Sequence, residues 1–107
     1  MQMNTSSSMS SKKRSILLRE AHLLKPAVLV GKQGLTEGVV QAVRESLDRH
    51  ELVKIKFNDF KENKRELLES IVRQTDAETV SVIGNVGIIY RRNEDPSKRV
   101  YHGIPLE

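Results

Sequence analysis

Hydrophobic positions at two different spacings predict a helix and then a short strand in the first third of the chain. Leu17 and Ala21 fall on one helical face from about residue 11 onward. Pro26 should end this helix, because the residue before a proline avoids the helical conformation. The unbroken apolar run 27–30 is typical of a strand that is buried on both faces. A segment with two glycines, 31–34, then interrupts the pattern.

An amphipathic helix and an alternating strand follow this interruption. Segment 36–50 places Val40, Val43 and Leu47 on one helical face, with charged residues on the opposite face. Residues 52–57 alternate between apolar side chains and lysines, which indicates a strand with one buried face and one polar face.

The start of the third helix is open to two interpretations. Asp59 with Glu62 has the spacing of a capping box, and so does Asn63 with Glu66. We favour the earlier start for this helix, which should end near Thr75.

Two β-rich runs, 79–83 and 88–92, complete the predicted domain. The residues between them, 84–87, are typical of a hairpin connection. The order α-β-α-β-α-β-β predicts an α/β fold, a two-layer sandwich with a mixed four-stranded sheet. Right-handed crossovers should place the second and third helices on one face of the sheet, and the first helix on the other face or an edge.

Polar segments at both ends set the expected domain limits. Residues 1–10 are rich in serine and are expected to be a disordered tail. Residues 94–107 are polar and are expected to be a flexible C-terminal tail, so the domain itself spans 11–93. No apolar run has the length of a membrane span or of a signal-peptide core, and a cytoplasmic location is therefore expected.

The charge balance favours a polyanionic partner. Lysine and arginine number 18 against 14 acidic residues, which gives a formal net charge of +4 and a pI near 9.6. Such an excess suits nucleic acid or acidic lipid, although charge that only maintains solubility would look the same. The absence of cysteine excludes disulfides, thiol catalysis and cysteine-based zinc sites.

The segment between the first strand and the second helix is a candidate anion site. It consists of Gly31, Lys32, Gln33 and Gly34. The first N–H groups of a helix lack internal partners and carry partial positive charge, and glycine lets the backbone approach a phosphate closely. Lys32 adds a mobile cation. A G-x-x-G tetrapeptide also serves as an ordinary tight turn, so that interpretation remains open.

Spacing excludes two enzymatic interpretations of the same segment. The nucleotide-hydrolase P-loop needs four residues between its glycines and a hydroxyl residue after the lysine, and the dinucleotide fingerprint needs a third glycine. Elsewhere, His22, His50 and His102 lack the spacing of metal ligands. No combination of nucleophile, base and acid can be assembled, so we expect no enzyme activity, no metal and no cofactor.

Other basic residues are candidates for a nucleic-acid surface around this segment. Those in and after the first helix are Arg14, Arg19, His22 and Lys25. Secondary candidates are Lys12, Lys13, Lys54, Lys56, Arg91 and Arg92. Runs of charge are usually just solvated faces, and Glu51 and Asp59 lie close to some of these residues. Aromatic residues are scarce, so recognition is expected to depend on backbone contacts rather than on base stacking.

Five segments of the chain form a recognisable set: AHLLKP (21–26), VLVGKQGLTEGV (28–39), HELVKIK (50–56), VIG (82–84) and IIYR (88–91). Together they resemble the YhbY family, the stand-alone bacterial form of the CRM (chloroplast RNA splicing and ribosome maturation) domain. The resemblance covers roughly residues 12–93, and the stretch 24–39 is its most specific part.

This resemblance implies both a fold and a function. It implies a fold like the C-terminal domain of a bacterial translation initiation factor, with an added N-terminal helix. It also implies RNA binding through a basic surface and the G-x-x-G loop, which falls here on Gly31 to Gly34 with Lys25 beside it. Stand-alone bacterial members associate with precursors of the large ribosomal subunit, and plant relatives act in group II intron splicing. Asn85 departs from the family, because many relatives carry a basic residue in that turn.

The leading hypothesis is therefore a monomeric protein that binds ribosomal RNA during assembly of the large ribosomal subunit. A protein-interaction module with incidental positive charge is the main alternative, and an RNA chaperone of the intron-splicing type is less favoured. A phosphate-handling enzyme that uses the same loop has the least support.

Overall fold

The computed structural model describes residues 9–105 as seven main elements in the order expected from the sequence. Most of the tail expected at 1–10 thus lies outside the described residues. The helices and strands are α1 (Ser11–Ala21), β1 (Val28–Val30), α2 (Glu37–His50), β2 (Leu52–Phe57), α3 (Lys64–Thr75), β3 (Glu78–Ile83) and β4 (Val86–Tyr90). Two short 3-10 helices, η2 (Lys61–Asn63) and η3 (Pro96–Lys98), complete the description.

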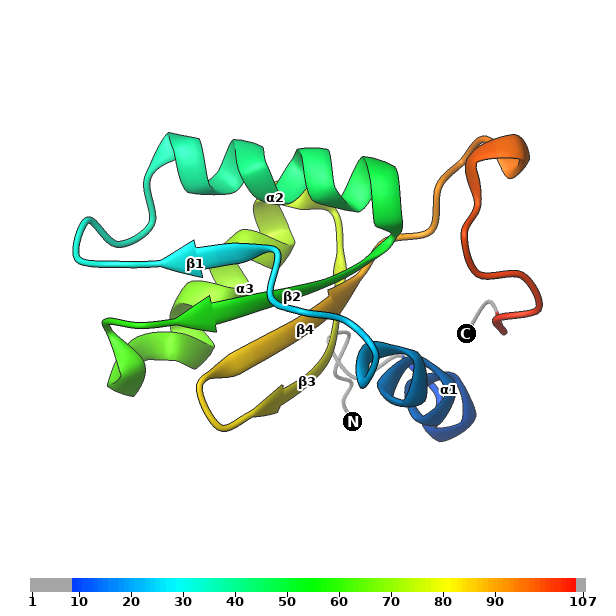
Figure 1. Cartoon of the computed structure of the whole chain (residues 1–107), viewed down its shortest axis with the longest axis horizontal. Coiled ribbons are helices and arrows are strands. Elements are labelled where there is room, and N and C mark those ends of the chain that lie inside the picture. Colours follow the sequence, from blue (N-terminus) through cyan, green and yellow to red (C-terminus); the bar gives the residue numbers. More distant parts are fainter. Residues whose placement is uncertain (1–8, 106–107) are drawn as a thin grey trace, which may run out of the picture.

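The four strands form one mixed sheet in the order β1-β2-β4-β3 (Figure 1). β1 runs parallel to β2, whereas β2 pairs with β4 and β4 with β3 in antiparallel fashion. The predicted α/β fold with a mixed four-stranded sheet is thereby confirmed. The hairpin strand β4 lies next to β2, so β1 and β3 are the two edge strands.

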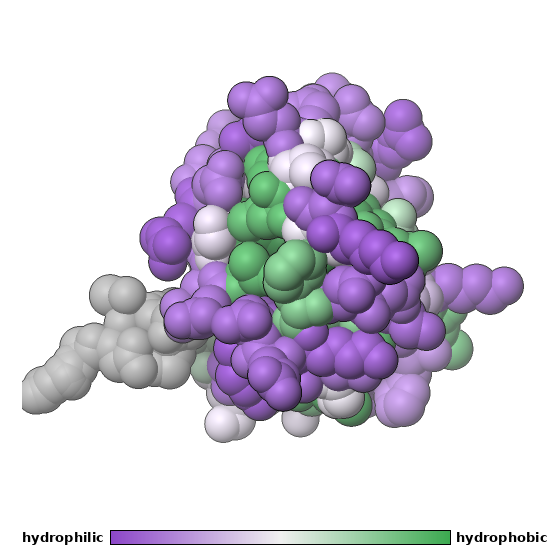
Figure 2. Space-filling model, turned by 90° about the vertical axis from the view of Figure 1, so that its left-hand side faces the viewer, coloured by the Kyte–Doolittle hydropathy of each residue, from purple (hydrophilic) through white to green (hydrophobic). Residues whose placement is uncertain are grey.

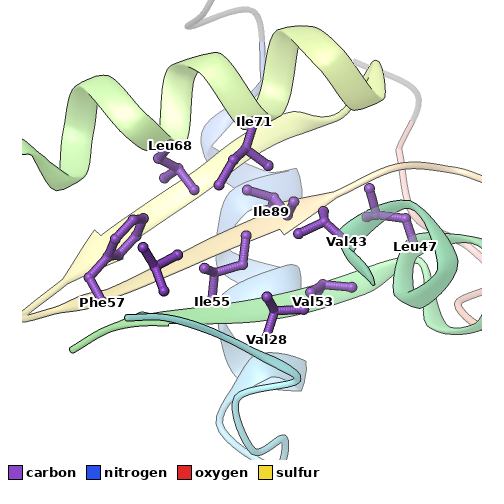
Figure 3. Packing of buried hydrophobic residues seen from close by; sticks show 10 residues of the cluster. Val28, Val43, Leu47, Val53, Ile55, Phe57, Leu68, Ile71 and Ile89 are labelled. Atoms are coloured by element: carbon purple, nitrogen blue, oxygen red, sulfur yellow. The ribbon is translucent and has the colours of Figure 1, made fainter. Parts of the chain in front are cut away.

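Two hydrophobic cores lie on opposite faces of this sheet. The larger core packs α2 and α3 against one face, as the right-handed crossovers predict (Figure 3). Its buried residues are Val28, Val30, Val43, Leu47, Val53, Ile55, Phe57, Leu68, Ile71 and Ile89. The smaller core joins α1 to the other face through Leu17, Ala21, Leu52, Val80, Ile88 and Tyr90. Within residues 9–105, no helix is long and apolar enough to cross a membrane.

The prediction that the first strand is buried on both faces is wrong. Val28 and Val30 are buried against α2, but Leu29 between them is 55% exposed. β1 is an edge strand, and α1 makes its main contacts with β2 and β3. The side of the sheet on which Leu29 lies is therefore open beside α1.

The third helix begins at the later of its two possible starts, so the favoured start at Asp59 is wrong. Phe60 adopts a left-handed conformation (φ 58°, ψ 37°), and the turn η2 precedes α3. Asn63 stands at the N-cap, and its side-chain Nδ2 donates to Glu66 Oε1 (3.3 Å). A left-handed residue interrupts the helical conformation that the earlier start requires.

The segment after β4 makes specific contacts with the domain. Glu51 is fully buried, and its carboxylate accepts hydrogen bonds from the N–H groups of Asn93 (2.6 Å), Val100 (2.8 Å) and Tyr101 (3.2 Å). Ile104 is buried in the smaller core. The sequence predicts a flexible tail at 94–107 and gives no sign of these contacts. In the structure they extend as far as Ile104.

Candidate nucleic-acid interface

The four residues Gly31 to Gly34 form a tight turn at the end of β1. The N–H of Gly34 donates to the carbonyl oxygen of Gly31 (2.9 Å), which closes the turn. Gly34 has a φ of 72°, a left-handed conformation that favours glycine. Lys32 and Gln33 stand at the two corners of the turn and are exposed.

Amides of the turn itself are available to an anion, and the start of helix α2 offers fewer than an uncapped helix would. Thr36 Oγ1 accepts a hydrogen bond from the N–H of Val39 (3.1 Å), and Glu37 places a negative charge in the first helical turn. The N-cap thus uses one of the first amides of α2, and Glu37 offsets part of the positive charge there, which weakens this helix start as an anion site. Within residues 9–105, the N–H groups of Lys32 and Gln33 have no hydrogen-bond partner.

The end of β2 and the residues after it support the turn from one side. The N–H groups of Asn58 (2.9 Å) and Asp59 (3.3 Å) both donate to the carbonyl oxygen of Val30. The ring of Phe60 covers Gly34, since a Cβ atom added there would lie 3.3 Å from Phe60 Cε2. The position of Phe60 at the turn does not follow from the sequence, where its only signal is an aromatic residue isolated in the polar segment 58–63.

The basic residues of α1 lie away from the turn. α1 packs over β2 and β3, while the turn follows the far end of β1 (Figure 1). Lys12, Arg19 and His22 are exposed. Arg14 is half-buried, and its Nε donates to the carbonyl oxygen of Val80 on the edge strand β3 (2.8 Å). The structure therefore separates the α1 candidates from the turn by the length of β1.

Lys13 is buried in the domain, which removes this secondary candidate from the exposed basic surface. Its side chain is 5% exposed, and its Nζ forms an ion pair with Glu78 Oε1 (2.8 Å). The same Nζ lies 5.3 Å from the centre of the Tyr90 ring, within cation–π range. Burial, followed by the nearby charge of Glu51, raises the pKa of the Tyr90 hydroxyl. Lys13 thus holds α1 to the sheet.

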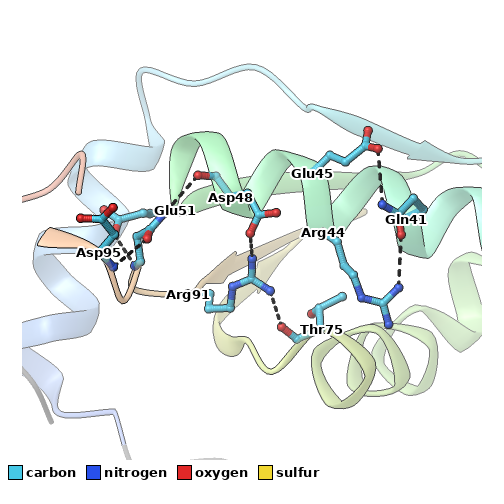
Figure 4. Close-up of polar contacts among 9 residues, drawn as sticks. Gln41, Arg44, Glu45, Asp48, Glu51, Thr75, Arg91 and Asp95 are labelled. Atoms are coloured by element: carbon cyan, nitrogen blue, oxygen red, sulfur yellow. Dashed lines mark hydrogen bonds and ion pairs between the residues drawn. The ribbon is translucent and has the colours of Figure 1, made fainter. Parts of the chain in front are cut away.

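Arg91 is also used within the fold. Its guanidinium donates to the carbonyl oxygen of Thr75 at the end of α3 (2.8 Å) and forms an ion pair with Asp48 of α2 (Figure 4). It therefore ties the ends of two helices to β4, and this secondary candidate is not free for RNA. Arg92 is half-buried next to it.

The two lysines of β2 differ in whether their ammonium groups are hydrogen-bonded within the domain. Lys54 Nζ donates to the carbonyl oxygen of Leu24 (2.9 Å), so it holds the segment between α1 and β1. Lys56 is exposed, and within residues 9–105 its side-chain ammonium has no polar partner. Lys25 is exposed near the start of β1, at the end opposite to Lys32.

Lys56 belongs to an open row of side chains that crosses the whole sheet. The strand register pairs Leu29 of β1 with Lys56, Lys56 with Val86 of β4, and Val86 with Ile83 of β3. Leu29 and Ile83 are among the exposed large hydrophobic residues. Three exposed lysines accompany these strands: Lys25 precedes β1, Lys56 lies on β2 beside Leu29, and Lys32 lies in the turn.

Figure 2 views the end of the molecule where the β1–α2 turn, the β2–η2 segment and the β3–β4 turn meet. Apolar side chains lie at its centre, and hydrophilic ones surround them. A surface of this kind can contact an uncharged part of a ligand at its apolar centre and a charged part of the same ligand at its hydrophilic margin. In the part of the chain that the structure describes, no three His, Cys, Asp or Glu side chains gather to hold a metal ion.

The fold and this surface define a small α/β domain with an exposed cationic G-x-x-G turn at the end of an edge strand. A sequence profile of the CRS1/YhbY (CRM) domain matches residues 9–91, and the chain belongs to this family.

Relatives and a solved structure agree with that assignment. A Haemophilus influenzae protein named as RNA-binding is 39% identical over 88 residues, which cover 81% of this chain and 89% of the relative. YqeI of Bacillus subtilis, named as a candidate RNA-binding protein, is 27% identical over 81% of this chain and 92% of its own length. The solution structure of a Staphylococcus aureus protein, described as a candidate RNA-binding protein, matches with a TM-score of 0.70 and 30% identity. It covers 85% of this chain and 96% of that one.

Proposed function

We propose that this protein binds RNA through the Gly31–Gly34 turn and acts in assembly of the large ribosomal subunit. The observation that carries the proposal is the exposed turn, in which the N–H groups of Lys32 and Gln33 have no partner within residues 9–105. Membership of the CRS1/YhbY (CRM) family and the names of the relatives support RNA as the partner.

In this proposal the turn holds a phosphate of the RNA backbone. Two unpartnered amides and the Lys32 ammonium supply hydrogen bonds and positive charge, and Gly31 leaves the approach open because no atom lies within 4 Å of its Cβ position. Such contacts fix the position of the RNA without reading its bases. Ribosomal RNA in precursors of the large subunit is the proposed ligand, and the protein acts as a cytoplasmic monomer.

Exposed basic side chains extend the proposed contact beyond the turn. Lys56 and Lys25 continue it along β2 and β1, and Lys12, Arg19 and His22 provide a second group of contacts on α1, away from the turn. Each contact with a phosphate releases counterions, so the affinity should fall steeply as salt rises.

Lys32→Ala is expected to weaken binding to large-subunit ribosomal RNA and to make its salt dependence less steep. One phosphate contact is lost, so the slope of log affinity against log salt should decrease by about one unit. Filter binding over a salt series measures both quantities.

Lys98→Ala is the matched control, because Lys98 is also exposed but lies in η3, distant from the turn (Figure 1). It should leave both the affinity and the slope close to those of the unmodified protein. Equal affinities and slopes for the two variants would remove Lys32 from the site.

A further inference from the structure

Phe60 has an exposure that sets it apart from the other aromatic residues. The chain has two phenylalanines, two tyrosines and no tryptophan. Phe57 and Tyr90 are buried and Tyr101 is half-buried, whereas Phe60 is 46% exposed. An aromatic ring that is half in water loses part of the hydrophobic stabilisation that burial would provide, so its position calls for another explanation.

The backbone of Phe60 has a positive φ that the end of a helix does not explain. Three non-glycine residues have a positive φ within residues 9–105: Glu51, Phe60 and Asp76. Asp76 directly follows α3 in the left-handed conformation that commonly ends a helix, and Glu51 directly follows α2 with a φ of 65° and a ψ of −37°. Phe60 instead precedes η2, where no helix end explains a left-handed conformation that a bulky side chain rarely adopts. Hydrogen bonds from Asn58 and Asp59 to Val30 hold the segment in place.

This unusual conformation directs the ring to the candidate phosphate site. Phe60 Cε2 lies 3.3 Å from the position that a Cβ atom of Gly34, the last residue of the turn, would occupy, and part of the ring remains open to solvent. A base and a phosphate of the same strand are joined through one sugar, so their binding sites must lie side by side. The ring and the turn satisfy that requirement.

The charges near the ring favour a base over a second phosphate. Phe60 lines a shallow pocket of about 420 Å³ together with Asn58, Asp59, Lys61, Glu62 and Asn63. Asp59 and Glu62 outnumber Lys61 there, whereas Lys32 is the charge on the turn itself. The exposed amide of Asn58 can donate to or accept from the edge of a base.

We propose that Phe60 stacks on an unpaired base of the RNA whose phosphate the Gly31–Gly34 turn holds. The inference rests on the proposed function and deepens it, because it assigns single-stranded or looped RNA as the ligand at this point. It also replaces the sequence-based expectation that recognition depends on backbone contacts alone.

Phe60→Trp provides a direct test, because the chain has no other tryptophan and the indole emission then reports on this position alone. A short single-stranded RNA of mixed sequence should quench the emission through stacking. A blunt duplex of the same length should quench it less, because its bases are already paired and stacked. Equal quenching by both RNAs, or none by a single strand that binds, would overturn the proposal.

Phe60→Leu tests the energetic contribution of stacking. Leucine keeps an apolar contact for Gly34 but has no aromatic face, so affinity for the single strand should fall about 5-fold or more. The salt slope should stay unchanged, because no charge is removed. Urea unfolding of the leucine variant shows whether the domain remains folded. Phe60→Tyr keeps an aromatic face and should bind the single strand about as tightly as the unmodified protein.

Val100→Ala is the matched control, since Val100 is 47% exposed and lies in the C-terminal segment, distant from the turn (Figure 1). An affinity of Phe60→Leu equal to that of this control, with RNA binding by the unmodified protein intact, would overturn the stacking role alone. Failure of the unmodified protein to bind any RNA would overturn the proposed function as well.

Discussion

Replacing Glu51 with alanine is expected to lower the free energy of unfolding by about 2–4 kcal/mol. The carboxylate is fully buried and accepts the N–H groups of Asn93, Val100 and Tyr101. Without it, three amides of the C-terminal segment lose their acceptor, and hydrogen bonds to a charged group are the stronger kind. Urea denaturation at neutral pH measures the change.

Two further variants separate the role of these hydrogen bonds from other effects. Glu51→Gln keeps one side-chain carbonyl oxygen and should destabilise less than Glu51→Ala. Glu69→Ala removes an exposed glutamate of α3 and should change stability by no more than about 0.5 kcal/mol. If Glu51→Ala behaves like Glu69→Ala, the carboxylate does not hold the C-terminal segment.

Replacement by alanine is expected to change the free energy of unfolding differently at the two glycines of the turn. Gly34→Ala should lower the free energy of unfolding by about 1–3 kcal/mol, because φ is 72° there and a Cβ would press on the Phe60 ring at 3.3 Å. Gly31→Ala should leave stability unchanged or raise it by up to about 1 kcal/mol, because its φ is not positive and its Cβ position is open.

RNA affinity should reveal a different role for Gly31. A methyl group at this open position narrows the approach of a phosphate to the turn, so Gly31→Ala should weaken RNA binding while the domain stays fully folded. Chemical denaturation and filter binding on the same preparations compare the two properties. Equal destabilisation by the two alanines would contradict the conformation described for this turn.

The elements with strong local patterns could be predicted from the sequence. β2 spans 52–57 as expected, because lysines alternate with apolar residues along it, and α2 differs from the expected helix by a single residue, its Thr36 cap. Periodicity depends on neighbouring residues only, so it succeeds where one face of an element is buried. The mixed sheet followed from the order of these elements.

The failures arise where residues distant in the sequence decide the local structure. The start of α3 depends on Phe60, whose left-handed conformation belongs to a segment that is hydrogen-bonded to Val30 of β1. Lys13 has the sequence character of a surface lysine, but Glu78 and Tyr90 provide it with a buried position. No local pattern contains such partners.

The candidate site was predictable in part for the same reason. The glycine spacing and Lys32 identified the turn, and the resemblance of residues 24–39 to a known family made it specific. Three-dimensional packing decides that Thr36 caps α2 and that Phe60 covers Gly34. The sequence therefore located the turn but not the groups that surround it.

Ultraviolet crosslinking in living cells, with the crosslinked peptide and the crosslinked transcript both identified, tests the central claim most directly. The account predicts peptides that contain residues 31–34 or Phe60, joined to ribosomal RNA of the large subunit. Crosslinks confined to the outer faces of α2 and α3, or recovery of other transcripts without large-subunit RNA, would contradict it.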